Sequence, residues 1–448
     1  MFNRKILTYL EQWKISHNRK PLILRGARQV GKTVSVQLFA NKHFKNFIAL
    51  NLEDPEQERL FRQPVSITEF EKIIQIKFNS TLVAGDTLLF IDEIQNSPAL
   101  ISLLRFFYEE RPALAVIAAG SLLEVKLKKG GLSFPVGRVE FAYLQPLDFF
   151  EFLEARRENN LLAALKNTGF NDPLPPAAAE IAARFFNEYL MIGGMPEAVE
   201  SYATEGNFQA LNQIYNSLLT SYQEDIFKYA SEAKAKYLTH CLENAPLFAG
   251  QTITYEHFGN SNYRSREMGE AFDTLEKAML LHQTRGCGAT ALPLVAQRKK
   301  APKLLFLDIG LVNYRLGIRD KIFEARELSG TFRGKIAEQV VGQHLLGLEP
   351  DRQNPIYYWY RDVPGSTAEI DYLLALQGNI IALEVKSGKS GRLRSLKEFI
   401  KMSGQKVAVR IHAGRLQKEI IHDGPINYEL ISLPFYLLPR LKEIILSA

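Results

Sequence analysis

The sequence GARQVGKT at residues 26–33 decides the fold of the first part of this chain. The apolar run PLILR (21–25) precedes it and the helical run VSVQLFANKHF (34–44) follows it, so the order is strand, glycine loop and helix. Gly26 and Gly31 let the backbone turn tightly, so that its N–H groups point toward an anion at the N-terminus of the helix. The stretch therefore predicts a phosphate-binding loop.

Each residue of this loop has an expected role in holding a nucleotide. Lys32 is expected to reach the β- and γ-phosphates, and Thr33 is expected to hold Mg²⁺. The expected nucleotide contacts come from the whole segment, namely Gly26, Ala27, Arg28, Gln29, Val30, Gly31, Lys32, Thr33 and Val34. The alternative is a glycine turn that matches by chance, which the flanking strand and helix disfavour.

A second apolar run, TLLFIDEIQ (87–95), predicts a buried parallel strand that ends in two carboxylates. Parallel α/β sheets bind their ligands at the carboxyl ends of the strands. Asp92 would support the magnesium ion. Glu93, one residue beyond the strand, would orient or deprotonate the attacking water, since phosphoryl transfer requires positioning and charge. A solvated Asp-Glu pair that caps a helix is the alternative.

Two further residues are candidates for contacts to the γ-phosphate. The run LAVIAAGS (114–121) predicts another core strand, with Ser121 at the same carboxyl edge. Ser121 could equally be the N-cap of a helix over 122–128. Arg138 follows a glycine-rich stretch and would reach phosphate charge in its own or a neighbouring subunit, as an arginine finger does, or else lie on the surface.

The motifs GARQVGKT, LLFIDEIQ (88–95), AAGS (118–121) and the GR…L.PL.F.EF pattern of 137–152 resemble the AAA-type ATPases of prokaryotes that are related to the archaeal ATPase group. The resemblance covers residues 1 to about 155. It implies a P-loop NTPase fold of the ASCE class with a parallel sheet, and binding of ATP and Mg²⁺. It also implies Glu93 as the catalytic glutamate, and we count Lys32 and Arg138 with it as catalytic.

Length and composition limit what the rest of the chain can be. At 448 residues the chain exceeds what one hydrophobic core usually supports, so we expect two to four domains. No run approaches the ~18 apolar residues of a membrane span, and the start MFNRKILTYLEQWK has no signal-peptide core. We therefore expect a cytoplasmic protein without a membrane partner.

Cysteine count and charge exclude some functions and leave others open. Cys241 and Cys287 show no paired spacing, so they predict neither a disulfide framework nor a four-ligand zinc site. The formal charge of +6 and the pI near 9.0 are compatible with a nucleic-acid partner, but the excess is modest for this length.

The middle of the chain predicts a helical lid followed by a second small domain. From about 175 to 235 apolar residues recur at three- and four-residue steps, and we assign the lid to 156–235. The break GGMP (193–196) is a turn by composition, and we take it as a marker of the resembled architecture. Residues 236–297 show a helix, a short segment, a helix from Ser265 and a tail. This order resembles a winged helix-turn-helix.

A winged helix-turn-helix would place the N-terminal turn of its second helix against DNA. That turn carries Tyr263, Arg264 and Arg266, and recognition helices contact bases and phosphates through such turns. Glu267 and Glu270 oppose a phosphate surface. A winged helix used for packing between domains is therefore the alternative.

The last part of the chain predicts a β-hairpin that carries acidic residues. It begins after the basic stretch RKKAPK (298–303), and TAEIDYLLAL and IIALEVKSG, separated by QGN, predict the hairpin over 367–388. Asp371 lies on the first strand, and Glu384 and Lys386 lie two apart on the second and so share one face. These are the parts of a metal-assisted phosphodiesterase: two carboxylates for a cation and a lysine for water.

This Asp…Glu-x-Lys arrangement resembles the PD-(D/E)xK nuclease superfamily, and Glu338 in GKIAEQVVGQHLL (334–346) matches the upstream helix glutamate of that superfamily. The resemblance implies a restriction-endonuclease-like α/β domain with a second divalent metal at Glu338, Asp371 and Glu384, and Lys386 as a nuclease residue. An AAA-type ATPase followed by a domain of unknown function with such a core is a known pairing. The alternative is a Glu384–Lys386 ion pair on an exposed strand.

The sequence thus predicts an α/β chain of four parts: 1–155, 156–235, 236–297 and 298–448. The favoured function is a nucleotide-switched, DNA-associated ATPase. The alternatives are an ATP-regulated, metal-dependent DNA nuclease and a non-catalytic switch that acts on a protein partner. An oligomer is compatible with the arginine-finger hypothesis for Arg138.

Overall fold

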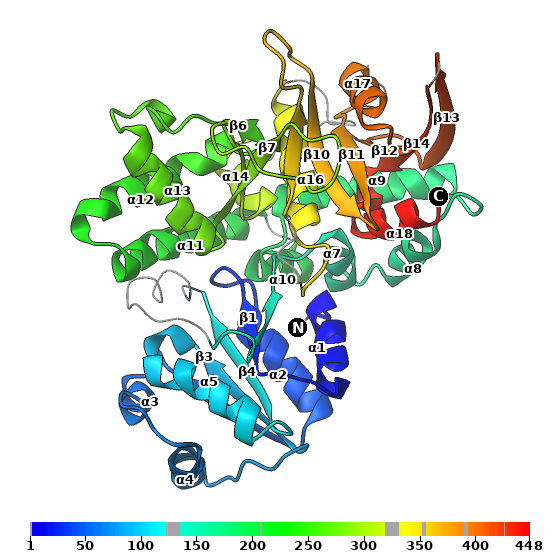
Figure 1. The fold of residues 1–448 in the computed structure, drawn as a ribbon. Helices are drawn as coiled ribbons and strands as arrows, with labels where there is room; N and C mark the ends of the chain where they lie inside the picture. Colours follow the sequence, from blue (N-terminus) through cyan, green and yellow to red (C-terminus); the bar gives the residue numbers. More distant parts are fainter. Residues whose placement is uncertain are drawn as a thin grey trace.

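The computed structural model describes residues 2–121, 123, 135–206, 208–318, 331–351, 355–388, 393–424 and 426–448. They form a five-stranded sheet in the N-terminal part and a nine-stranded sheet in the remainder. Figure 1 shows the blue and cyan N-terminal part on one side of the molecule and the green-to-red remainder on the other. The expectation of an α/β chain with a parallel N-terminal sheet is confirmed.

The N-terminal sheet is parallel, with the strand order β2-β3-β4-β1-β5. Its strands are β1 (Leu22–Arg25), β2 (Asn46–Asn51), β3 (Thr87–Asp92), β4 (Ala115–Gly120) and β5 (Glu140–Tyr143). β1, β3 and β4 are the three strands that the apolar runs predict, and they are buried almost throughout. β2 and β5 are partly exposed, and they were not among the strands that we predicted from the sequence.

Helices cover both faces of this sheet, and alternate residues of each strand face one side or the other. On one face, Leu22 and Leu24 of β1 join a core that includes α1 (Lys5–Ile15) and α2 (Lys32–His43). On the other face, Ile23 joins a core with α4 (Ile67–Phe78) and α5 (Pro98–Glu110). The short helix α3 (Pro55–Leu60) lies between β2 and α4 in the chain. β4 lies between β1 and β3, which is the ASCE arrangement.

The next part of the chain is helical, as the periodicity predicts. It comprises α7 (Phe149–Ala155), α8 (Asn159–Asn167), α9 (Pro176–Ile192), α10 (Pro196–Glu205) and α11 (Phe208–Tyr229). The core that contains Leu22 and Leu24 continues from the N-terminal sheet through these helices into the C-terminal part. The helical part is therefore packed against both sheets.

The turn between α9 and α10 joins three parts of the chain. Gly193 has φ 72° and ψ −163°, a conformation that is essentially restricted to glycine. The Gly194 N–H donates to Asp308 Oδ2 at 2.7 Å, and the Leu147 N–H donates to Gly194 O at 2.7 Å. A Cβ on Gly194 would lie 2.1 Å from Leu147 O. The GGMP turn thus connects Leu147, near the end of the N-terminal domain, to Asp308, which lies 114 positions after Gly194.

Asp308 is the fully buried centre of this junction. Besides Gly194, it accepts hydrogen bonds from the N–H of Gly310 at the start of α14 (Ile309–Leu316) and from Gln343 Nε2 of α16 (Thr331–Leu346). Burial raises the pKa of Asp308 to about 6, although these donors favour its charged form. One carboxylate therefore holds α10, α14 and α16 together.

The predicted second helix of the middle region is confirmed, since α13 spans Ser265–Lys277. It follows α12 (Glu232–Asn244) and the short strand β6 (Gln251–Thr252), and precedes β7 (Leu281–Cys287) and β8 (Lys303–Phe306). Two 3₁₀ turns, η2 (Ala245–Phe248) and η3 (Phe258–Asn260), lie between α12 and α13. This order follows the predicted sequence of elements, and its assignment as a winged helix stays a prediction.

The nine-stranded sheet has the order β13-β14-β12-β11-β10-β9-β7-β8-β6. Its remaining strands are β9 (Tyr357–Tyr360), β10 (Glu369–Leu376), β11 (Asn379–Val385), β12 (Val407–His412), β13 (Gln417–Asp423) and β14 (Ile426–Pro434). α16 packs on one face and α17 (Arg394–Ser403) on the other. η4 (Phe435–Arg440) and α18 (Leu441–Leu446) end the chain.

The predicted β-hairpin is present, and the sheet extends beyond it. β10 and β11 pair antiparallel around Gln377 and Gly378, which both have positive φ, at 47° and 79°. This is the backbone twist of the tightest hairpin turns. β7 pairs with β8 and with β9, so hydrogen-bonded strands lie on both sides of residue 298. A domain boundary at residue 298 stays a prediction, and it would divide one sheet.

Two negative expectations concern cysteines and the membrane. Cys241 and Cys287 are both buried and free. Across the described part of the chain, no helix combines the length and the apolar character that crossing a bilayer requires.

Candidate functional site

The glycine loop lies between β1 and α2, as predicted. A Cβ on Gly26 would lie 2.6 Å from Leu144 O, so the close approach of two backbones requires glycine at the first position. Gln29 and Gly31 have φ of 65° and 95°, which turns the chain into α2. Gly31 is the N-cap residue of that helix and has no side chain, so the first N–H groups of α2 can bind an anion.

Lys32 lies across the loop that precedes it. Its Nζ donates to Gly26 O at 3.0 Å and to Ala27 O at 2.9 Å, and the residue is only 6% exposed. Burial lowers the pKa of Lys32, while Glu93 and Asp92 act to raise it. The ammonium group is therefore held within the loop, next to two carboxylates.

Thr33 and Asp92 bring the loop and the end of β3 together. Thr33 Oγ1 donates to Asp92 Oδ2 at 2.6 Å, although 59 residues separate them in the chain. A hydroxyl and a carboxylate are the oxygen ligands that Mg²⁺ prefers. These two residues therefore fit the magnesium ion that the sequence predicts.

Glu93 follows β3 directly, in a left-handed conformation with φ 53° that is uncommon for a residue with a side chain. Gln95 Nε2 donates to Glu93 Oε2, and the Glu93 N–H donates to Asp92 Oδ1 at 3.0 Å. Burial raises the pKa of Glu93, an effect that Lys32 opposes. The backbone turn thus places Glu93 directly after the end of β3, and Gln95 holds one of its oxygens.

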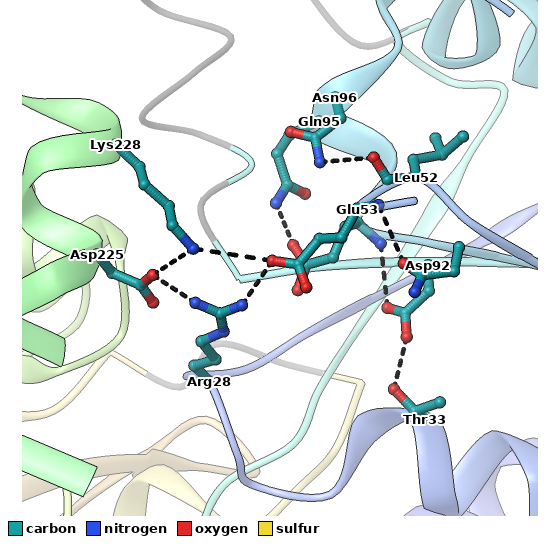
Figure 2. A network of polar contacts seen from close by, with 11 residues as sticks. Arg28, Thr33, Leu52, Glu53, Asp92, Gln95, Asn96, Asp225 and Lys228 are labelled. Atoms are coloured by element: carbon teal, nitrogen blue, oxygen red, sulfur yellow. Dashed lines mark hydrogen bonds and ion pairs between the residues drawn. The ribbon is translucent and has the colours of Figure 1, made fainter. Parts of the chain in front are cut away.

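Arg28 links the loop to helix α11 (Figure 2). Its guanidinium forms ion pairs with Asp225 of α11 and, at 2.5 Å, with Glu53 after β2. Lys228 Nζ lies 2.9 Å from Asp225 Oδ1 and 3.9 Å from Glu53 Oε1. Tyr222 of the same helix donates its hydroxyl to Arg28 O at 3.2 Å. Two cations and two carboxylates therefore join three segments beside the nucleotide loop.

An open groove of 560 Å³ lies along α11 at this network. Its lining is polar, with Arg28, Asp225 and Lys228 at one end and amide and hydroxyl side chains of α11 along it. Arg4, which precedes α1, contacts the loop separately, because its Nη1 donates to Val30 O at 3.1 Å. The loop is thus contacted by three segments that lie outside the motif: the segment of Arg4, the segment of Glu53 and helix α11.

The other predicted nucleotide contacts differ in exposure. Ala27 and Val30 are fully buried in the core, while Val34 in the first turn of α2 is 46% exposed. Ser121 follows β4 at the predicted sheet edge and is buried. The helix that Ser121 would cap as the alternative lies outside the described residues, apart from Leu123. Only the position of Ser121 at the edge is therefore established.

Arg138 lies on the surface and contacts a residue of its own domain. Its Nε donates to Glu109 Oε1 at 3.1 Å, and its side chain is 44% exposed. An arginine finger at this position would have to leave Glu109 to reach a nucleotide. The finger hypothesis for Arg138 stays a prediction.

The three residues predicted to contact DNA at the N-terminal turn of α13 differ in how far they are exposed to solvent. Tyr263 is half-buried, with its ring 4.8 Å from that of Tyr237. Arg264 and Arg266 are exposed, and Arg266 Nε lies 3.6 Å from Glu270 Oε1. Two arginines are therefore available at this turn, and the tyrosine is part of the packing.

The four predicted nuclease residues converge in the C-terminal part, around a lysine that the sequence did not indicate. Lys303 Nζ lies 2.6 Å from Glu338 Oε2 and 3.3 Å from Asp371 Oδ1. Lys386 Nζ lies 2.6 Å from Glu384 Oε1, so this ion pair forms as in the alternative. However, β11 is a buried strand and Glu384 is only 7% exposed.

Burial and mutual repulsion alter the acidity of these carboxyls. Burial and Asp371 raise the pKa of Glu338 to about 8 and that of Glu384 to about 7. Among the described residues, which include all of these acids, no group of three or more His, Cys, Asp or Glu is arranged to hold a metal ion. The predicted second metal set of Glu338, Asp371 and Glu384 stays a prediction, and Lys303 lies among its carboxylates.

Sequence motifs alone missed several residues of these sites: Arg4, Glu53, Gln95, Asp225, Lys228 and Lys303. Asp225 had a usable signal, since it continues the helical spacing of the buried Leu218 and Tyr222 and is itself buried. An acid on the apolar face of a helix requires a partner, which here is Arg28. Lys303 had only a weak signal, as the last of a basic stretch before an apolar run.

Comparison with protein families divides the chain into three segments. Residues 18–153 match the family described as "AAA domain", residues 183–322 match "Domain of unknown function (DUF8612)" and residues 333–436 match "Domain of unknown function (DUF4143)". A comparison with curated proteins finds no match. The nuclease-like core of the last segment is not part of these findings.

Solved structures show only distant similarity to the chain. The RuvB Holliday junction branch migration motor of Thermotoga maritima is 16% identical with a TM-score of 0.29, covering 66% of this chain and 93% of that one. PCH-2 of C. elegans is 14% identical with a TM-score of 0.28, covering 45% of this chain and 60% of that one. Such scores carry no argument about function.

The glycine loop, the acidic end of β3 and the parallel strand order therefore agree with the family match of the same segment. Residues 18–153 thus match the AAA domain family and have the parallel sheet and glycine loop of a P-loop NTPase, and two segments that match families of unknown function follow in the same chain.

Proposed function

We propose that this chain binds and hydrolyses ATP at its N-terminal domain and that the bound nucleotide switches helix α11. The hydrogen bond of 2.6 Å between Thr33 and Asp92 carries the first part, because it brings two magnesium ligands together beside the loop. Lys32 and the N-terminus of α2 supply positive charge for the phosphates. Mg²⁺, when bound, neutralises phosphate charge during transfer.

Glu93 is the residue of this site that would act on the attacking water. Its raised pKa makes it a stronger base than an ordinary carboxylate, and its hydrogen bond from Gln95 fixes its orientation. Phosphoryl transfer depends mostly on positioning and charge. An oriented base together with the two positive charges of the site, Lys32 and bound Mg²⁺, would therefore be sufficient for hydrolysis.

Lys32→Ala is expected to weaken ATP binding by about 10- to 100-fold, because a charge-assisted contact to phosphate contributes about 1.5–3 kcal/mol. Titration with a fluorescent ATP analogue in the presence of Mg²⁺ measures this loss. Lys45→Ala is the matched control, since the Lys45 side chain is 77% exposed and pairs with Asp86. Equal affinity of both variants would contradict the proposed role of the loop.

The second part of the proposal rests on the ion pairs between the loop and α11. Arg28 belongs to the glycine loop, and its positive charge is neutralised by Asp225 and Glu53. Phosphate groups bound in the loop would compete with Asp225 for this guanidinium, since both are anions. Asp225 is only 5% exposed, so losing the arginine would leave this buried carboxylate with one cation, Lys228, in place of two, which favours displacement of the helix.

Asp225→Asn is expected to reproduce, without nucleotide, the change in α11 that ATP causes in the wild type. Hydrogen–deuterium exchange over 208–229 should rise in the wild type on binding a non-hydrolysable ATP analogue, and should already be raised in the variant. Glu224→Gln, at an exposed neighbouring carboxylate, is the control and should behave as the wild type. Exchange in α11 that does not change when the nucleotide binds would refute the coupling between the loop and α11.

DNA association is the second candidate for the output of this switch. It is supported by the net charge of +6 and by the exposed Arg264 and Arg266 at the start of α13. The exposed Glu270 and Asp273 on the same helix oppose it. ATP hydrolysis stimulated by duplex DNA, with a stimulation that falls as salt rises, would support this output. A rate of ATP hydrolysis that does not change when DNA is added would favour a protein partner.

A further inference from the structure

The divalent ion that the nuclease resemblance implies for Glu338, Asp371 and Glu384 does not fit the residues present, because a buried ammonium group already lies among the acids. Lys303 is 2% exposed, and its Nζ lies 2.6 Å from Glu338, 3.3 Å from Asp371 and 3.6 Å from Glu369. A lysine ammonium group and a divalent cation at such distances from the same oxygens would repel each other strongly in a buried site.

The backbone and the surrounding rings keep Lys303 in this position. Lys303 begins β8, where it pairs with Thr284 of β7 on one side and with Thr252 of β6 on the other. Its Nζ lies 5.3 Å from the ring centre of Tyr372 and 5.8 Å from that of Tyr358. These rings favour a cation and limit access of water to it. The side chain therefore has no exposed position to which it can readily move.

The charge of Lys303 is secured by the acids around it. Three carboxylates lie within 3.6 Å of its Nζ, and their negative charges favour the ammonium form. The ammonium form is thus the form that the cluster stabilises.

Several oxygens that would otherwise face a metal are occupied by the protein itself. Asp371 Oδ2 accepts the N–H of Val385 at 2.8 Å, and Glu384 Oε1 accepts from Lys386 Nζ at 2.6 Å. Glu384 Oε2 is buried without a hydrogen-bond partner among the described residues. Donors of the protein itself therefore already occupy oxygens of Asp371 and Glu384 that a metal would need.

We propose that Lys303 takes the place of a divalent ion as the permanent internal cation of this cluster. The C-terminal part then keeps the acidic residues of a nuclease without binding a catalytic metal through them. The ammonium group joins β8 to α16 and to β10, so the cluster connects the middle of the chain to its C-terminal sheet. This inference does not depend on ATP hydrolysis by the N-terminal domain.

Binding of Mn²⁺ to the full chain without nucleotide tests the proposal, with free Mn²⁺ followed by electron paramagnetic resonance. The wild type and Asp371→Asn should bind Mn²⁺ equally weakly. Lys303→Met removes the ammonium group and should gain one Mn²⁺ site at least about tenfold tighter than any in the wild type. Adding Asp371→Asn to Lys303→Met should abolish that site.

Three results would overturn the proposal. The first is wild-type Mn²⁺ binding that Asp371→Asn removes. The second is cleavage of plasmid DNA by the wild type with Mn²⁺ that Asp371→Asn removes. The third is a folded Lys303→Met protein that gains no Mn²⁺ site. If Lys303→Met does not fold, the comparison of the wild type with Asp371→Asn decides between the outcomes. Lys303→Arg, which keeps a cation, should remain folded and bind Mn²⁺ as weakly as the wild type.

Discussion

Glu93→Gln is expected to slow ATP hydrolysis by about 10²- to 10⁴-fold, the usual contribution of a general base, while ATP binding stays within about twofold of the wild type. The amide keeps the size of the side chain and an oxygen that can accept the hydrogen bond from Gln95. It loses the negative charge and the ability to accept a proton from water. Phosphate release in the steady state measures the rate, and titration with an ATP analogue measures binding.

The pH profile of hydrolysis gives an independent readout of the same residue. A base acts when it is deprotonated, so the rate should fall as the pH is lowered through the pKa of Glu93. Because burial raises that pKa, the fall should begin at a higher pH than for an ordinary carboxyl group. The fall should be absent from the residual activity of Glu93→Gln.

The matched control for this variant is Glu110→Gln, at an exposed carboxylate near the end of α5. It should hydrolyse ATP at the rate of the wild type. A Glu93→Gln protein that retains the full rate would mean that another group positions the water, and it would remove Glu93 from the mechanism while leaving nucleotide binding intact.

Gly194→Ala is expected to lower the free energy of unfolding by at least about 3 kcal/mol, since buried polar groups that lose their partners cost about 1–3 kcal/mol each. The added Cβ would lie 2.1 Å from Leu147 O and 2.7 Å from Leu147 N. Both neighbours are backbone atoms and cannot rotate away. A shift of the turn would break the hydrogen bonds that Gly194 makes with Leu147 and Asp308.

Chemical denaturation of the full chain measures this loss, with Gly169→Ala as the control. Nothing lies within 4 Å of a Cβ built on Gly169, so this substitution should change stability by no more than about 0.5 kcal/mol. Equal stability of the two variants would mean that the α9–α10 turn tolerates a displaced backbone, and that the junction at Asp308 does not depend on it.

The junction around Gly194 explains how the nucleotide domain is attached to the rest of the chain. Leu147 ends the segment that follows β5, Gly194 lies between α9 and α10, and Asp308 begins α14. They meet through the backbone groups of Leu147 and Gly194 and the buried carboxylate of Asp308. The composition of GGMP predicted a turn there, but it contained no information about which backbone would approach the glycine.

The sequence alone determined the features that depend on neighbouring residues. The order of strand, glycine loop and helix at 21–44 is local, because glycine conformations and helix N-termini act within a few residues. The buried strand that ends at Asp92 follows from one apolar run, and the β10–β11 hairpin follows from two runs around a short turn. The periodicity of the lid likewise predicted α9, α10 and α11.

Only the tertiary structure decided which charges meet. Arg28 and Asp225 are separated by 197 residues, and Lys303 and Asp371 by 68, so no local pattern pairs them. Each pair is specified by the cost of burying a charge without a partner, which acts only once the chain has folded around it. The sequence also predicted acids suited to a metal on β10, β11 and α16. It did not predict that β8 would bring the ammonium group of Lys303 among these acids, because that contact depends on how the strands pair.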